Sequence, residues 1–180
     1  MQTIRLKDKL FQQYITEDEI QTRVRDIKDE LLQKYEDKKP IFIVVLRGAF
    51  MFASDLLKLY NAPCEIEFVK LSSYEGMESS GKINIELHLN EPKIKGRDII
   101  IIEDIVDSGL TMRFFKDYLQ ELQPASVSLV SFLVKPENFE HDISVDITGF
   151  MIPNLFVVGY GLDFDGEGRN FSAVYQLVPA

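Results

Sequence analysis

The sequence predicts an α/β protein with a mostly parallel sheet. Apolar runs of strand length alternate along the chain with segments of helical periodicity, which is typical of strand–helix–strand units joined by right-handed crossovers. Two of the runs, residues 40–46 and 98–104, contain stretches without a polar side chain, as expected for strands covered on both faces. With 180 residues, the chain is expected to form one domain, residues 1–180.

The first long element is a predicted helix over residues 15–35. It opens with a capping box, Thr16 to Glu19, and then carries Ile20, Val24, Ile27 and Leu31 at helical spacing. A loop is expected over residues 73–82, which are rich in serine, glycine and charge. The other predicted elements are strands at 40–46, 64–74, 82–90, 98–104, 126–134 and 155–163, and helices at 49–60 and 111–122, the last with Phe114, Tyr118 and Leu122 on one stripe.

Composition and charge exclude several classes of protein. The chain has 29 acidic and 20 basic residues, a net charge of −9 that is poorly suited to binding nucleic acid or an anionic membrane. Its single cysteine, Cys64, excludes an intrachain disulfide and is expected to be a small core residue. The first residues are charged, and no apolar run reaches the roughly 18–20 residues of a membrane span. We therefore expect a cytoplasmic protein.

Three acids lie at the carboxyl end of the predicted strand 98–104: Glu103 and Asp104 are its last residues, and Asp107 follows shortly after it. In α/β sheets, ligands bind beyond the carboxyl ends of the strands. The next residues, Asp107 to Thr111, lead into a helix, so that their backbone N–H groups and hydroxyls can form an anion cradle. Carboxylates accept hydrogen bonds from sugar hydroxyls and can hold Mg²⁺. The pattern favours a ligand that is both hydroxylated and phosphorylated over the simpler interpretation of solvated acids that cap a helix.

The thirteen residues 99–111 read as four apolar, two acidic and two apolar residues followed by Asp-Ser-Gly-Leu-Thr. This resembles the phosphoribosyl pyrophosphate (PRPP) signature of the type I phosphoribosyltransferases. Four further segments resemble the hypoxanthine–guanine branch in the same order: "VVLRGAFMFASDL", "LSSYEGMESSGK", "FLVKPENF" and "PNLFVVGYGLDFDGEGRNF". The resemblance extends from Ile41 to the C-terminus. Two departures are Ser108, where the family often has threonine, and two glycines before Arg169, where relatives commonly have bulkier residues.

The resemblance implies the fold of that family: a mostly parallel twisted sheet flanked by helices, a small hood formed by the terminal segments, and a mobile lid loop. It also implies a homodimer or homotetramer, and a Mg²⁺-dependent reaction in which a 6-oxopurine displaces pyrophosphate from PRPP. In the family the Arg47-Gly48 peptide is often cis, which the sequence cannot show.

The resemblance assigns roles to individual residues. Asp107 is the expected general base, and Glu103 and Asp104 are expected to orient the ribose hydroxyls and Mg²⁺. The phosphates are expected to contact Arg47, Gly48, Ser108, Gly109, Leu110, Thr111 and Arg169. The purine side is expected to include Lys135, Phe156, Val157 and Asp163, of which Asp163 also holds Mg²⁺, and the lid is expected to carry Ser73 and Tyr74.

Alternatives remain at this stage. A sibling enzyme that prefers xanthine fits the same residues, and an RNA-binding regulator with the PRPP fold is disfavoured by the net charge of −9. A calcium loop at Asp163 fails because Val174 occupies the position of the required glutamate, and no phosphate-binding P-loop motif occurs. His88 and His141 have no acid or cysteine at metal-ligand spacing and are expected at the surface.

Overall fold

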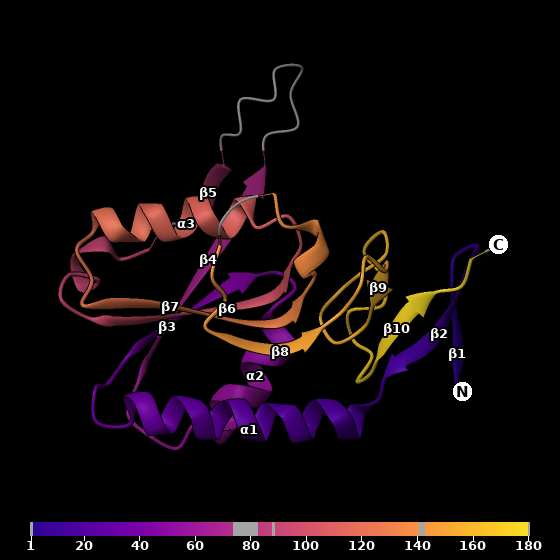
Figure 1. Cartoon of the computed structure of the whole chain (residues 1–180), viewed down its shortest axis with the longest axis horizontal. Coiled ribbons are helices and arrows are strands. Elements are labelled where there is room, and N and C mark those ends of the chain that lie inside the picture. Colours follow the sequence, from indigo (N-terminus) through magenta and orange to yellow (C-terminus); the bar gives the residue numbers. More distant parts are fainter. Residues whose placement is uncertain (1, 74–82, 88, 141–142, 180) are drawn as a thin grey trace.

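The computed structural model describes residues 2–73, 83–87, 89–140 and 143–179 (Figure 1). Its centre is a six-stranded sheet with the order β5-β4-β3-β6-β7-β8. The pairs β3–β4, β3–β6, β6–β7 and β7–β8 are parallel, and only β5 runs antiparallel to its neighbour. This confirms the predicted α/β fold. Ser73, expected on the lid, is the last residue of strand Glu65–Ser73. Tyr74 and the other expected lid residues up to 82, as well as His88 and His141, lie outside the described residues.

The elements have the following bounds. The strands are β1 Thr3–Leu6, β2 Lys9–Ile15, β3 Ile41–Leu46, β4 Glu65–Ser73, β5 Ile83–Leu87, β6 Asp98–Val106, β7 Ser126–Val134, β8 Ile147–Met151, β9 Val157–Val158 and β10 Val174–Leu177. The helices are α1 Glu17–Tyr35, α2 Phe50–Leu59 and α3 Leu110–Glu121, with short 3-10 turns at Glu91–Lys93 and Pro136–Asn138.

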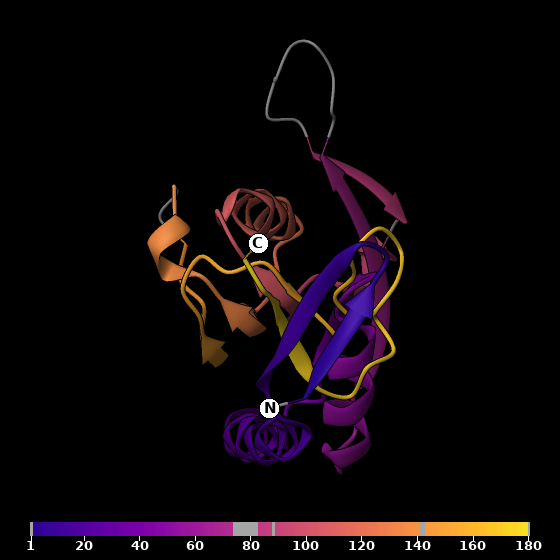
Figure 2. The same cartoon turned by 90° about the vertical axis from the view of Figure 1, so that its right-hand side faces the viewer.

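Helices cover both faces of the large sheet. Seen end-on, α3 lies on one side of the sheet and α1 on the other (Figure 2). The four isoleucines of β6 alternate between these layers: Ile100 and Ile102 pack in the core with α1 and α2, whereas Ile99 and Ile101 pack in the core with α3. Successive strand residues point to opposite faces, so a strand buried on both sides must be apolar throughout. The uninterrupted isoleucine run is therefore a consequence of two-sided burial.

The long helix α1 begins where the sequence predicts. Thr16 is its N-cap, and both hydrogen bonds of the capping box with Glu19 are formed. The predicted apolar stripe, Ile20, Val24, Ile27 and Leu31, is fully buried against the sheet and α2. Among the described residues, no helix is long and apolar enough to cross a membrane.

The hood is a second, antiparallel sheet with the order β1-β2-β10-β9. It joins the first residues of the chain to the last, because β2 pairs with β10 (Figure 1). A separate small core, which includes Leu6, Phe11, Val158 and Tyr175, holds it together. The expected hood of terminal segments is thus present.

The structure corrects two details of the predicted elements. The expected strand at 155–163 is only the two residues of β9, and it lies in the hood instead of the large sheet. The chain then turns through Gly159 to Gly161, where positive φ angles prevent a continued strand. On α3 the buried stripe is Met112, Phe115 and Leu119, one residue away from the predicted Phe114 stripe.

Candidate active site

Three neighbouring strands deliver the candidate residues to one edge of the large sheet. Strands β3, β6 and β7 lie side by side and parallel, so their carboxyl ends meet. Arg47 follows β3, Asp107 follows β6 and Lys135 follows β7. Parallel sheets place ligand sites at this edge. The topology therefore gathers residues that lie far apart in the sequence.

The acids Glu103 and Asp104 lie in the last part of β6. Glu103 is buried, and its Oε2 has no hydrogen-bond partner among the described residues. Burial raises the pKa of Glu103 well above its usual value, and the negative charge of Asp104 raises it further. Burial also raises the pKa of Asp104. Two carboxyls placed so unfavourably for charge suit a ligand that brings a cation or hydroxyl donors.

Gly48 lies directly against Asp104. A Cβ built on Gly48 would stand 1.5 Å from Asp104 Oδ2, so a larger residue cannot occupy this position unless the carboxyl moves. The peptide bond between Leu46 and Arg47 is cis. The family expectation had placed the cis bond one residue later, at Arg47-Gly48, and the structure corrects it.

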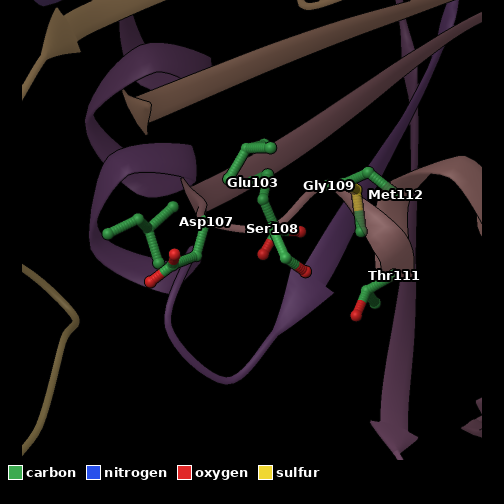
Figure 3. A pocket seen from close by; sticks show the side chains of 8 residues that line it. Glu103, Asp107, Ser108, Gly109, Thr111 and Met112 are labelled. Atoms are coloured by element: carbon green, nitrogen blue, oxygen red, sulfur yellow. The ribbon is translucent and has the colours of Figure 1, made fainter. Parts of the chain in front are cut away.

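The predicted anion cradle is present at the start of α3. Gly109 is the N-cap in the left-handed conformation, with φ of 84°, which turns the chain sharply from β6 into the helix. The turn encloses the cradle pocket, a hollow of about 150 Å³ lined by Glu103, Asp107, Ser108, Gly109 and Thr111 among others (Figure 3). No acid occupies the first turn of α3, so the positive end of the helix dipole is left for an anion.

Asp107 is held by two donors. Lys135 Nζ donates to its Oδ2 at 2.7 Å, and Asn138 Nδ2 donates to its Oδ1 at 2.6 Å. Burial raises the pKa of Asp107, but the hydrogen bonds from Lys135 and Asn138 outweigh this effect, and the pKa lies below its usual value. Lys135 is buried, so it is not the solvated lysine that its place after a strand would allow. The sequence analysis missed Asn138, for which the only signal was its place three residues after Lys135.

Asp163 and Arg169, in the segment after β9, form an ion pair. Arg169 Nη2 lies 2.5 Å from Asp163 Oδ1, and Arg169 Nη1 donates to the carbonyl of Gly161 at 2.7 Å. Both side chains line the edge cleft, a hollow of about 470 Å³ that they share with Arg47, Gly48, Glu103 and Asp104 among others. The two glycines before Arg169 therefore do not keep it away from the other candidate residues.

Phe156 and Val157 lie in the hood, and neither is among the residues that line the cradle pocket or the edge cleft. Phe156 is 49% exposed, and its ring contacts those of Phe11 and Phe164 at centroid distances of 6.3 and 5.9 Å. An exposed aromatic ring supported by two others is a suitable surface for stacking a planar base. Among the described residues, no group of three or more histidine, cysteine or acidic side chains is placed to hold a metal on its own.

Comparison with known proteins gives the family. A family model described as the phosphoribosyl transferase domain matches residues 13–165. This chain belongs to the phosphoribosyltransferase family, in its hypoxanthine–guanine branch. It is 41% identical to the hypoxanthine-guanine phosphoribosyltransferase of Bacillus subtilis over 92% of both chains. It is 37% identical to that of Aquifex aeolicus, over 96% of this chain and 97% of the relative.

Other relatives are longer, and solved structures agree on the fold. The chain is 42% identical to the bifunctional protein TilS/HprT of Listeria monocytogenes, but it spans only 26% of that protein's length. The crystal structure of a hypoxanthine phosphoribosyltransferase from Staphylococcus aureus aligns with a TM-score of 0.86 at 35% identity, covering 97% of this chain and 92% of the other. The match confirms the phosphoribosyltransferase fold expected from the signature at residues 99–111.

Proposed function

We propose that the protein is a purine salvage enzyme that converts hypoxanthine or guanine and PRPP to IMP or GMP and pyrophosphate. The observation that carries the proposal is the meeting, at one sheet edge, of the buried Glu103 beside Asp104, an anion cradle and the Asp107–Lys135 pair. Those groups match the parts of the substrates: ribose hydroxyls, a 5′-phosphate, and a purine with one proton to lose and one carbonyl to bind.

The reaction forms a bond from a purine ring nitrogen to C1′ of the ribose and breaks the bond from C1′ to pyrophosphate. Asp107 would accept the proton of the ring nitrogen. Its lowered pKa keeps the carboxyl charged, and its oxygens have lone pairs beyond those used by Lys135 and Asn138. Lys135 would donate to the exocyclic oxygen of a 6-oxopurine. Adenine carries an amino group in place of this oxygen, so it would lose the hydrogen bond and set a donor against the buried ammonium group, a strong basis for rejection.

The 5′-phosphate would bind the cradle pocket through the backbone of Ser108, Gly109 and Leu110 and through the hydroxyls of Ser108 and Thr111. Pyrophosphate would lie in the edge cleft near Arg47, Gly48 and Arg169, where a guanidinium fork suits phosphate oxygens. Phe156 would stack on the purine, and the Val157 backbone would pair with its edge.

Mg²⁺ is the proposed cofactor, and the residues present fit it. Glu103, Asp104 and Asp163 line the cleft proposed for pyrophosphate, and within the described part of the chain the buried Oε2 of Glu103 has no hydrogen-bond partner. A site with few protein ligands is normal for Mg²⁺, which usually keeps several waters and binds substrate phosphates as well. When bound, Mg²⁺ would neutralise the charge that develops on the leaving pyrophosphate.

We further propose a cytoplasmic protein that forms a homodimer or homotetramer. Support for self-association comes from an apolar groove between α2 and β4, where Phe50, Ile66 and Phe68 are exposed side by side. A monomer that exposes several large apolar side chains in one groove commonly uses them for contact. Sedimentation of the wild type beside Phe68→Lys tests this, and a wild type that sediments as a monomer contradicts it.

The test of the activity is spectrophotometric. Nucleotide formation from PRPP and Mg²⁺ is measured with hypoxanthine, guanine, xanthine and adenine, for the wild type and for Asp107→Asn. We expect turnover of hypoxanthine and guanine and a loss of about 10²- to 10⁴-fold in the variant. A preference for xanthine would select the sibling activity. No turnover of any purine, combined with salt-dependent RNA binding, would select the regulator instead.

A further inference from the structure

Tyr160 is a buried residue with an unusual backbone, next to the edge cleft. It is 1% exposed, and its φ of 48° lies in the left-handed region between Gly159 at 98° and Gly161 at 101°. Glycine adopts such angles freely, whereas tyrosine rarely does. A tyrosine held there needs support from its surroundings, which comes from its backbone N–H, donating to the carbonyl of Phe171 at 2.8 Å, and from its side-chain contacts.

Those contacts are a hydrogen bond and a ring contact. Tyr160 Oη donates to Asp55 Oδ2 at 2.9 Å, and its ring lies on that of Phe132 at 4.7 Å between centroids. Asp55 also accepts from Gln21 Nε2 at 2.8 Å and pairs with Lys58 Nζ at 2.9 Å. Burial raises the pKa of Asp55, but the hydrogen bonds from Lys58, Gln21 and Tyr160 lower it below its usual value. Asp55 is thus a charged anchor that joins α1, α2 and the turn.

The residue after Tyr160 faces the candidate active site. The carbonyl of Gly161 accepts from Arg169 Nη1 at 2.7 Å, and its N–H donates to the carbonyl of Arg169 at 2.9 Å. A Cβ on Gly161 would stand 1.9 Å from the carbonyl oxygen of Gly48, so the two backbones are in close contact. Gly48 in turn lies against Asp104. The turn therefore touches both the arginine and the loop proposed for pyrophosphate.

We propose that Tyr160, through its hydrogen bond to Asp55, is a positioning residue for the pyrophosphate half of the site. It fixes residues 159–161 so that Gly161 holds Arg169 on one side and meets Gly48 on the other. Tyr160 itself does not touch substrate. The proposal rests on the proposed function, because it assigns PRPP to the cleft beside Arg169.

The test is Tyr160→Phe, which keeps the ring and removes only the hydroxyl. Tyr35→Phe is the matched control, because Tyr35 is also 1% exposed and its hydroxyl hydrogen-bonds with Ser128 Oγ at 2.6 Å, near the opposite end of β7 from Lys135. Loss of a hydrogen bond to a charged group is large enough for about a tenfold effect. We expect the KM for PRPP to rise about tenfold in Tyr160→Phe, with the KM for hypoxanthine within about twofold of wild type. Tyr35→Phe should change neither KM, although both variants lower Tm.

Asp55→Ala supplies a second measurement, since its side chain is at the partly exposed surface of α2. Combined with Tyr160→Phe, it should raise the KM for PRPP no further than the stronger single variant, because both remove the same hydrogen bond. In an active enzyme, two results would overturn the positioning role alone. One is an equal rise of the KM for PRPP in Tyr160→Phe and Tyr35→Phe; the other is a rise in the double variant that equals the combined effects of Asp55→Ala and Tyr160→Phe. An inactive wild type would overturn the proposed function and the positioning role with it.

Discussion

Replacing Gly48 with alanine should damage the binding of PRPP while leaving most of the fold intact. The added Cβ would stand 1.5 Å from Asp104 Oδ2 and 2.3 Å from its Cγ. Ordinary contact requires roughly 3.4 Å or more, so the Asp104 carboxyl has to turn away or the loop after β3 has to shift. Either movement displaces a group proposed to bind ribose, Mg²⁺ or pyrophosphate.

The size of the effect of Gly48→Ala on PRPP binding follows from the crowding around the added methyl group. Forcing one extra methyl group into a well-packed site costs about 1–3 kcal/mol. If that cost falls on the complex with PRPP, the loss in kcat/KM is roughly 5- to 150-fold, since 1.4 kcal/mol corresponds to a factor of ten. The free protein relieves part of the crowding by moving Asp104, so its stability should fall by less than the binding free energy does.

The assay is calorimetric titration with PRPP and Mg²⁺ together with initial rates at varied PRPP. Gly96→Ala is the control: its φ of 70° is unfavourable for alanine, but no atom beyond the neighbouring residues lies within 4 Å of the added Cβ, and the position precedes β6 at the far end of the strand. It should lower stability and leave the KM for PRPP unchanged. The reasoning is refuted if Gly48→Ala binds PRPP within about twofold of wild type, or if Gly96→Ala weakens binding equally.

Three further variants test other parts of the site and core. Asn138→Ala removes one of the two donors that lower the pKa of Asp107, so this pKa should rise. The acid limb of the pH profile of kcat/KM should then move to higher pH, and a limb that stays in place or moves to lower pH contradicts the assignment of Asp107 as the base. Lys135→Gln should cut kcat/KM for hypoxanthine by about 10²-fold or more in the same rate assay, and full activity would remove Lys135 from purine recognition. Ile101→Ala, in the middle of β6 and fully buried, should lower the free energy of unfolding by about 2–5 kcal/mol in urea titrations, and a loss below about 1 kcal/mol would show that this core collapses to fill the cavity.

The pairing of Asp107 with Lys135 also makes stability depend on pH in a defined direction. The folded-state pKa of Asp107 is lowered, so its contribution is present above the unfolded-state pKa and is lost as pH falls through the folded-state pKa. Asp107 is half exposed, so solvent screening keeps the contribution small. The activity profile is therefore the more sensitive measurement of this group.

The local sequence determined the framework of the large sheet. Strand β7 has the predicted bounds, and β3 and β6 differ from theirs by no more than two residues, because strands that are buried on both faces are mostly apolar. The start of α1 could also be predicted from the sequence, since a capping box is a contact between residues only three apart in the chain. The signature at residues 99–111 correctly predicted the cradle because its acids, glycine and hydroxyls belong to one short turn.

Tertiary structure decided whatever depends on pairing between distant segments. The hood strands are short, and β2 finds its partner β10 about 160 residues later, a contact that no local pattern encodes. The buried stripe of α3 is set by how the helix sits on the sheet, so Phe115 is buried where Phe114 was expected. Asn138 and Tyr160 belong to the same class, because each acquires its role only when a turn after one strand is folded against a carboxylate carried by another element. The sequence by itself thus specified the strands and the chemistry carried by single turns, while packing selected which distant side chains complete the site.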